Sequence, residues 1–200
     1  PSKQIMVAPI GLDLKNYQTA LPATPPPYSI SFIGSLDWVP NQEGLSWFLA
    51  EVWTIIRAQY PSLELHIAGR NTPDWVMEKE GNGVVVHGEI SDAKAFLAAH
   101  PISIVPLFSG SGMRVKILEG MAMGRVVLTT TLGIEGIAAK NEEEVLIADS
   151  KEEFVKKLRY CVENQNAVDK IMQNARTFIQ QHFDNLAIAK TVLEEFRNSI

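Results

Sequence analysis

The chain has 200 residues, of which 46% are hydrophobic and 20% charged, and this length and apolar content suit one globular domain with a full core. Its formal net charge of −5 excludes a sequence-wide attraction to nucleic acid or to anionic membrane surfaces. Any anionic ligand must therefore be held by a local cluster of groups.

The first 27 residues have the composition of a connecting segment. A short apolar stretch ends in residues 9–13, and prolines at positions 22, 25, 26 and 27 then stiffen the chain. Regular structure is expected from about Tyr28. We therefore predict an inter-domain segment with a proline-rich linker at residues 1–27 and one folded domain at residues 28–200.

Six short apolar runs follow, separated by segments with helical periodicity. They cover residues 30–34, 63–69, 84–88, 102–107, 126–129 and 145–148. Strands that alternate with helices form parallel sheets with right-handed crossovers. The sequence therefore predicts an α/β fold, a Rossmann-like three-layer domain with a six-stranded parallel sheet in the order 3-2-1-4-5-6 and additional C-terminal helices.

The helix expected between the first two strands is well marked. Apolar side chains recur at 3.6-residue spacing from Leu45 to Ile56, which is typical of a helix with one buried face. Asn41 is the expected N-cap of this helix. Trp47 and Trp53 lie within it and are expected to pack between elements of the domain, because the tryptophans do not cluster in a carbohydrate-stacking pattern.

Three helical patterns follow the sixth apolar run. Ser150 and Glu153 have the spacing of a capping box and begin a helix whose apolar face includes Cys161. This cysteine is therefore interpreted as a core residue and not as a nucleophile. Two further helices, around residues 168–179 and 186–196, are expected to pack outside the sheet.

Three loops have residues suited to a ligand, which in open parallel sheets lies beyond the carboxyl ends of the strands. In the first loop, Gly34 and Ser35 end a strand shortly before a helix, whose free backbone N–H groups can face an anion. Glycine after a buried strand is as often simple turn chemistry. Both interpretations of this loop stay open.

The second loop, at residues 109–112, carries the strongest signal. Its small residues let the backbone approach a phosphate, and the N-terminus of the following helix adds partial positive charge. Arg114 and Lys116 supply full charges at the same place. The residues expected at a bound diphosphate are Gly34, Ser35, Gly110, Ser111, Gly112, Met113, Arg114 and Lys116.

Glu119 lies three residues after Lys116, on the same face of the expected helix. Helical side chains lean toward the N-terminus, so this carboxylate is expected to point back toward the bound group. There it can accept hydrogen bonds from the two ribose hydroxyls of a nucleotide. The competing interpretation is a surface ion pair with Lys116, which contributes little stability.

The rim of the site is expected to include residues that follow or end the second, third and fifth strands. They are Arg70, His87, Gly88, Gly133 and Glu135. Isolated charged residues in such loops are more often simply solvated, and the glycines also suit flexible turns. A solvated side chain therefore remains the alternative for Arg70 and Glu135, and a flexible turn for the loop that contains Gly133.

The remaining sequence features concern redox state, metals and membranes. Cys161 is the single cysteine and cannot form an internal disulfide, and no signal-peptide pattern occurs, so a cytoplasmic protein is expected. No apolar run approaches the ~20 residues needed to cross a bilayer. The histidines, at positions 66, 87, 100 and 182, are scattered without ligand spacing, so no metal site is predicted.

Several of these segments belong together as a set of motifs. They are PIGLD at 9–13, FIGSLDW at 32–38 with Pro40 and Asn41, IAGR at 67–70, VPL at 105–107, GSG at 110–112, KILEGMAMG at 116–124 and GIEG at 133–136. Jointly they resemble the C-terminal domain of family-four retaining glycosyltransferases, which have the two-domain GT-B fold. The resemblance covers nearly the whole chain, and its motifs are specific as a set but not singly.

This resemblance implies that the domain binds a nucleotide-diphosphate sugar, a UDP- or GDP-sugar, and that transfer proceeds with retention, without a cofactor or metal. It implies a missing N-terminal domain that binds the acceptor, and it leaves peripheral membrane association of that domain open. A role in polysaccharide biosynthesis fits, and the 200-residue chain alone is expected to be inactive.

The family's paired-glutamate motif falls on positions 111 and 119 of this chain. Glu119 matches the second glutamate, which holds the ribose, whereas Ser111 stands where the first would fall. Many members also have an arginine and a lysine in the first loop, which are absent here, so Arg114 and Lys116 are expected to supply that charge. The departure at Ser111 leaves the identity of the sugar and the catalytic residues undetermined.

Rival functions share parts of this pattern. A GT-B-like sugar-nucleotide epimerase or phosphorylase would have the same fold, although nothing singles out the pyridoxal lysine of a phosphorylase. A non-catalytic nucleotide-binding or interaction module with a degenerate site is the alternative from another class, and Ser111 favours it. A dinucleotide oxidoreductase is disfavoured, because no Gly-x-Gly-x-x-Gly follows the first strand.

Overall fold

The computed structural model describes residues 8–17 and 29–198, and the proline cluster therefore lies outside the described residues. Six strands form one sheet: β1 (Ser29–Ile33), β2 (Glu64–Ala68), β3 (Val84–Gly88), β4 (Ile102–Val105), β5 (Val126–Thr129) and β6 (Leu146–Ile147). Neighbouring strands pair in parallel, in the order β3-β2-β1-β4-β5-β6. The predicted sheet and its strand order are confirmed.

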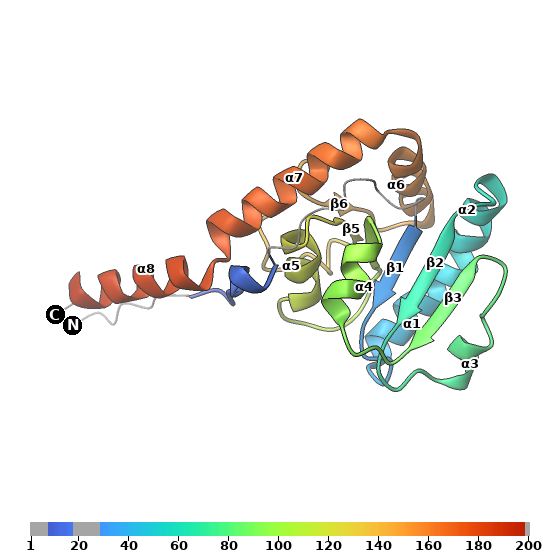
Figure 1. Cartoon of the computed structure of the whole chain (residues 1–200), viewed down its shortest axis with the longest axis horizontal. Helices are drawn as coiled ribbons and strands as arrows, with labels where there is room; N and C mark the ends of the chain where they lie inside the picture. The colour runs from blue at the N-terminus through green and yellow to red at the C-terminus, as the bar shows by residue number, and fades with distance from the viewer. Residues whose placement is uncertain (1–7, 18–28, 199–200) are drawn as a thin grey trace.

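Helices cover both faces of this sheet (Figure 1). The connection between β1 and β2 is helical from residue 39 to residue 59, as α1 (Val39–Trp47), the π-helical segment η2 (Phe48–Trp53) and α2 (Thr54–Gln59). The other helical elements are η1 (Leu14–Tyr17), α3 (Asp74–Met77), α4 (Ala93–Ala99), α5 (Val115–Ala122), α6 (Lys151–Glu163), α7 (Gln165–His182) and α8 (Asn185–Asn198). In Figure 1, α4 and α5 lie in front of the sheet and α1 and α2 behind it.

Two apolar clusters fill the space between the layers. One joins one side of the strands to the helical segment 39–59 and to α6, with Phe48, Val52 and Phe154 fully buried. The other joins β5 to α5 and α7, with Ile117 and Ile179 fully buried. The apolar stripe predicted within residues 45–56 therefore faces the core, as expected from its 3.6-residue period.

The segment before the linker packs on the same domain. Leu12 forms a parallel bridge with Asp184, and its backbone N–H donates to the carbonyl of Phe183 at 2.7 Å. The Asn185 N–H donates in turn to the Leu12 carbonyl at 3.0 Å, and the Leu12 side chain is buried. Residues 11–17 are thus attached to the junction between α7 and α8.

Several local predictions are confirmed. Ser150 and Glu153 form the capping box at the start of α6, with reciprocal side-chain to backbone hydrogen bonds. Cys161 is fully buried in the first apolar cluster, and burial raises the pKa of its thiol to about 12, so it is a core residue. Trp47 packs edge-on against Phe154, at 5.1 Å between ring centroids.

The prediction that Asn41 caps α1 is wrong. The helix begins at Val39, its N-cap position is Trp38, and the Trp38 side chain makes no capping hydrogen bond. Pro40 explains the earlier start, because proline lacks the N–H that the first helical turn leaves unpaired and its φ suits that turn. Asn41 is buried inside the first turn and its side chain serves the ligand edge described below.

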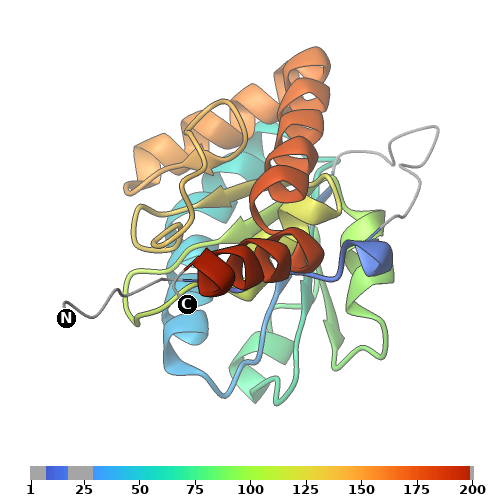
Figure 2. The same cartoon turned by 90° about the vertical axis from the view of Figure 1, so that its left-hand side faces the viewer.

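The expected packing of the last helix is also wrong. The helix forms, but it projects away from the sheet (Figures 1 and 2). Its large apolar side chains are exposed, at 69% for Leu186, 56% for Leu193 and 66% for Phe196. Across the described part of the chain, no helix is both long enough and apolar enough to span a membrane.

Three histidines meet on one face of the sheet, contrary to the expectation that they are scattered. His66 on β2 and His87 on β3 lie 3.0 Å apart at their ring nitrogens, and His100 stacks on His66. Each offers a ring nitrogen within 4.8 Å of the others. Linear spacing gave no sign of this cluster, because pairing of strands and a crossover helix brings the three residues together.

Candidate functional site

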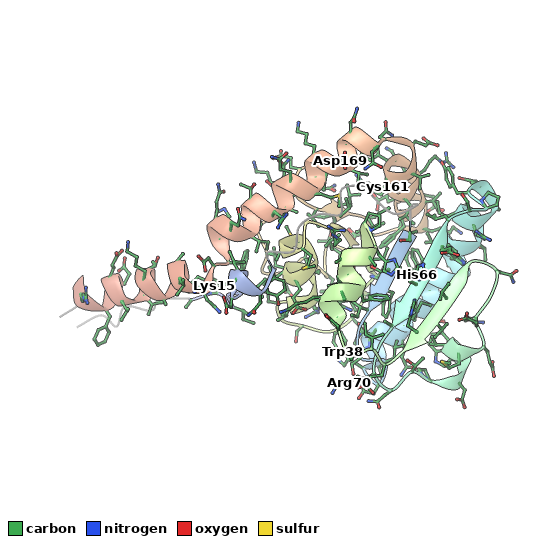
Figure 3. All side chains as sticks on the ribbon, viewed as in Figure 1. Lys15, Trp38, His66, Arg70, Cys161 and Asp169 are labelled. Atoms are coloured by element: carbon green, nitrogen blue, oxygen red, sulfur yellow. The ribbon has the colours of Figure 1, made fainter. Side chains whose placement is uncertain are left out.

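The loops at the carboxyl ends of β1, β2 and β4 meet at one edge of the sheet. Figure 3 labels Trp38 and Arg70 at this end of the sheet, and the Leu36 N–H donates to the Arg70 carbonyl at 2.9 Å. A Cβ atom on Gly44 would lie 1.6 Å from the Pro106 carbonyl oxygen. Only glycine therefore allows α1 to pack directly on the loop after β4.

The loop at residues 109–112 depends on two glycines with left-handed backbone. Gly110 has a φ of 96° and Gly112 a φ of 87°, which side-chain-bearing residues rarely adopt. Ser109 joins the loop to α1, because its Oγ donates to Oε2 of Glu43 at 2.8 Å. The backbone of this loop is therefore held in a shape specified by the Gly-Ser-Gly sequence.

Arg114 occupies the N-cap position of α5 and is buried, with 6% of its surface exposed. One guanidinium nitrogen, Nη1, donates to the carbonyls of Ser111 and Gly112. The other two, Nε and Nη2, are buried without a hydrogen-bond partner. The guanidinium also lies over the Trp38 ring, 5.7 Å from its centroid. Unpaired charged donors at a buried position are costly, and an anionic ligand would satisfy them.

Lys116 reaches from α5 to the end of β1. Its Nζ donates to Oδ1 of Asn41 at 2.7 Å and lies over the Phe32 ring, while the Asn41 amide donates to the Ser35 carbonyl at 2.8 Å. Burial of the ammonium group, and then the charge of Arg114, lowers the pKa of Lys116 to about 7. The predicted diphosphate residues of the first and second loops are therefore joined through Asn41.

Glu119 is half-buried on α5, and its partner is Tyr17 of η1. The Tyr17 hydroxyl donates to Oε1 of Glu119 at 2.8 Å. Burial, followed by this hydrogen bond and the carboxylate charge, raises the pKa of Tyr17 to about 12. Lys94 lies over the same ring, 4.9 Å from its centroid. The carboxylate thus faces a hydroxyl, whereas the considered ion-pair partner Lys116 is turned toward Asn41.

Arg70 lies next to a small polar network at the end of β1. The Asp37 carboxylate accepts from the Ser35 hydroxyl and from the Asn71 amide. These two hydrogen bonds, with a smaller effect of the Arg70 charge, hold the pKa of Asp37 below its ordinary value. Ser35 is therefore oriented by Asp37, a residue to which sequence reasoning assigned no role.

The other rim residues occupy separate places. Gly88 ends β3 with a φ of 64° and has open space around it, so backbone is exposed there. The ring of His87 instead contacts His66 across the strands. Gly133 is buried, with its N–H donating to the Thr130 hydroxyl at 2.9 Å, and Glu135 is exposed in the same turn. The rim assignments of all five residues stay predictions.

Tyr17 and Trp38 also lie at this edge and were not singled out from the sequence. Tyr17 is 102 residues away from its partner Glu119, so no local pattern could have paired them. Trp38 lies between β1 and the start of α1 and is exposed at 38%, and only the fold shows that the Arg114 guanidinium lies over its ring. The edge as a whole brings together basic groups, glycine backbone with left-handed φ and the carboxylate of Glu119, which suits an anion that also carries hydroxyls.

Residues 27–164 match the family model described as "Glycosyl transferases group 1". A curated relative from Klebsiella pneumoniae, described as "Uncharacterized 44.6 kDa protein in cps region", is 27% identical over 177 residues. That match covers 84% of this chain and 45% of the relative, so the chain spans about half the length of that relative.

Solved structures show the same fold at low sequence identity. Sucrose-phosphate synthase from Thermosynechococcus elongatus superposes with a TM-score of 0.77 at 19% identity, over 98% of this chain and 53% of that one. The C-terminal domain of a group 1 glycosyl transferase, LpcC, from Francisella tularensis has a TM-score of 0.74 at 18% identity, over 88% of this chain and all of that one.

Anabaena Alr3699/HepE, solved with UDP and glucose, has a TM-score of 0.74 at 17% identity and covers 96% of this chain and 56% of its own. The similarity to these structures confirms the Rossmann-like fold of GT-B domains, with its sheet order. The family assignment rests on the matched model, which covers more than half of the chain. The chain therefore belongs to the group 1 glycosyl transferases.

Proposed function

We propose that this chain is the donor-binding half of a two-domain glycosyltransferase. In this proposal the carboxyl edge of the sheet binds a nucleotide-diphosphate sugar, and the sugar passes to an acceptor with retention of anomeric configuration, as in family-four enzymes. The observation that carries the proposal is the buried guanidinium of Arg114, with two unpaired nitrogens beside the Gly-Ser-Gly loop.

The diphosphate is assigned to Arg114, Lys116 and the N-terminus of α5. Charge-assisted hydrogen bonds from arginine to phosphate are about twice as strong as neutral ones, and helix N-termini favour anions. These groups would neutralise the diphosphate without a metal ion or cofactor. The glycines at 110 and 112, with their left-handed backbone, let the phosphates approach the main chain.

The nucleoside is assigned to Glu119. Its carboxylate already accepts a hydroxyl hydrogen bond from Tyr17 at 2.8 Å, which is the chemistry that the two ribose hydroxyls would offer. In this proposal the ribose joins or replaces the Tyr17 hydroxyl. UDP is the first nucleotide to test, because it is bound in the structurally similar Anabaena protein, and GDP is the second.

The acceptor is assigned to a second domain that precedes this one in the whole protein. Two observations support that division. The chain covers 45% of its Klebsiella relative and about half of several solved structures, and α8 presents Leu186, Leu193 and Phe196 to solvent. Exposed apolar side chains in a row mark interaction surfaces. The relative's description as a protein of the cps region fits a role in polysaccharide biosynthesis.

Calorimetry of UDP binding to the 200-residue chain, without divalent metal, tests the donor site. Arg114→Met should weaken binding by on the order of tenfold or more, since a hydrogen bond to a charged group contributes roughly 1.5–3 kcal/mol. Arg159→Met is the matched control, because Arg159 is exposed on α6 and pairs with Gln59. Equal UDP affinity in folded Arg114→Met and wild type would refute the assignment.

A non-catalytic nucleotide-binding module is the second candidate. Ser111, at the position of the first motif glutamate, favours it, because here the Ser111 carbonyl holds Arg114 and no carboxylate faces the sugar from this position. The two candidates differ in turnover by the whole two-domain protein. Release of UDP from UDP-glucose or a related donor supports the enzyme, whereas tight UDP binding without turnover of any common UDP- or GDP-sugar supports the module.

A further inference from the structure

The histidine cluster lies away from the proposed donor site. His66 is in the middle of β2, His87 is near the end of β3, and His100 is in the connection between α4 and β4. In Figure 3, His66 lies over the sheet, whereas Trp38 and Arg70 mark the carboxyl edge. The three imidazoles share the sheet face opposite to the one that carries Leu65 and Ile67 in the first apolar cluster.

The nitrogen atoms of the cluster are close to the spacing that one metal ion requires. Nδ1 of His66 and Nε2 of His87 lie 3.0 Å apart, and the ligand atoms of the three residues all lie within 4.8 Å of one another. Zinc–nitrogen bonds of about 2.0–2.1 Å in a tetrahedral site hold the nitrogens roughly 3.3–3.4 Å apart. A bound ion would therefore have to draw the nitrogens closer together, and His87 is exposed and has room to move.

The outer nitrogens of two rings already have partners. Nε2 of His66 lies 3.3 Å from Oε2 of Glu64, which leaves Nδ1 facing the cluster. Nδ1 of His100 lies 2.8 Å from the Ser29 hydroxyl, which leaves Nε2 as the free nitrogen. Metal-bound histidines characteristically hold their second nitrogen in this way, most often with a carboxylate. Two of the three candidate ligands are thus oriented before any metal binds.

The rings are also in the protonation state that ligands need. Burial lowers the pKa of His100 to about 4, and burial together with the neighbouring His87 lowers the pKa of His66. Both imidazoles are therefore neutral near pH 7 and have a lone pair to give. Glu64 adds negative charge beside the cluster and Arg125 adds positive charge near His100, so the local field does not exclude a cation.

We propose that His66, His87 and His100 form a three-histidine site for a divalent transition metal, with Zn²⁺ as the fitting ion. Nitrogen ligands suit zinc and its neighbours, whereas Mg²⁺ and Ca²⁺ prefer oxygen. The ion connects β2, β3 and the segment before β4, and a water completes the coordination on the exposed side of His87. His66 and His100 have no place in the proposed donor site, whereas His87 is also one of its predicted rim residues, and zinc binding is tested without a nucleotide.

Titration of the chain, without an affinity tag, with zinc chloride tests the site. We expect one Zn²⁺ to bind for each chain. A free Zn²⁺ concentration roughly a hundredfold above the Kd should raise Tm by about 5–10 °C. Magnesium chloride should have no effect. His87→Gln should weaken zinc binding by on the order of 100-fold. Loss of a residue that only orients a metal ligand already costs about 10–100-fold in affinity, and His87 would be a ligand itself. His182→Gln is the matched control, since the ring of this fourth histidine lies outside the cluster and contacts Phe178, at 4.7 Å between centroids.

A second measurement covers the case in which a variant unfolds. Cobalt chloride added to the wild-type chain should give the intense visible absorption of a four-coordinate Co²⁺ ion, and excess Zn²⁺ should abolish it. A weak spectrum like that of aqueous cobalt would overturn the proposal. So would sub-stoichiometric zinc binding by the wild type, or zinc affinity that stays unchanged in His87→Gln.

Discussion

The lowered pKa of Lys116 predicts that nucleotide binding takes up a proton. In the free chain, burial and Arg114 lower this pKa to about 7, and the Nζ atom is held by Asn41. A bound diphosphate brings negative charge to the same place and should return the pKa toward the ordinary lysine value of about 10.4. Between these two values the complex holds a proton that the free chain lacks, so affinity must fall as pH rises.

The size of the effect follows from the two pKa values. For a free pKa of about 7 and a bound pKa near 10, linkage gives affinity that is on the order of tenfold lower or more at pH 9 than at pH 7. The second ionisation of a phosphate, near pH 6, is complete in this range and does not contribute.

Calorimetry of UDP binding in two buffers with different ionisation enthalpies measures the proton directly. At pH 8 to 8.5 the wild-type chain should take up close to one proton for each UDP bound. Lys116→Met should bind UDP weakly and without proton uptake, and Lys151→Met, which alters an exposed pair with Glu51, should behave like wild type. Proton uptake by Lys116→Met equal to that of wild type would refute the assignment.

Two further predictions concern the neighbours of this site. Glu119→Gln should weaken UDP binding on the order of tenfold and reduce the preference for UDP over 2′-deoxy-UDP, because the charged acceptor is lost. If the variant and the wild type had the same preference, the role of Glu119 would be limited to its hydrogen bond with Tyr17. Gly44→Ala should lower the free energy of unfolding, measured by denaturation, by roughly 1–3 kcal/mol or more, because the added Cβ would lie 1.6 Å from the Pro106 carbonyl oxygen. An unchanged free energy of unfolding would mean that α1 can shift without cost.

The sheet was predictable because its strands are short, largely apolar runs that alternate with helical segments. Runs such as residues 102–107 and 126–129 are buried throughout, as expected for parallel strands covered by helices. The capping box at Ser150 was predictable for a similar reason, since its two partners are three residues apart. Features set by local spacing are thus visible in the sequence.

Features set by long-range contacts were not predictable. Asn41 has the chemistry of a helix cap, but Pro40 moved the helix start and left the amide to join Lys116 with the Ser35 carbonyl. The periodicity of α8 correctly indicated a helix but carried no information on whether its apolar face is covered within this chain. The histidine cluster and the Tyr17 hydrogen bond likewise require strand order and crossovers.

Lys116 also allows a functional role to be separated from a structural one. The pKa of Lys116 is about 7 in the folded chain and has its ordinary value in the unfolded chain. Between these two pKa values the unfolded chain binds more protons, so this lysine makes the free energy of unfolding rise with pH. Its destabilising effect is complete below pH 7 and fades toward pH 10. Lys116→Met should therefore raise the free energy of unfolding at pH 6, and raise it less at pH 9.5, although it weakens UDP binding.

Opposite effects on stability and binding are typical of groups kept for a ligand. Denaturation curves of wild type, Lys116→Met and the surface control Lys151→Met at both pH values would measure this. If Lys116→Met were instead less stable than wild type at both pH values, the hydrogen bond from Lys116 to Asn41 would be a structural contact. The charge at this edge of the sheet would then come from Arg114 and the N-terminus of α5, and the proton-uptake argument would fail with it.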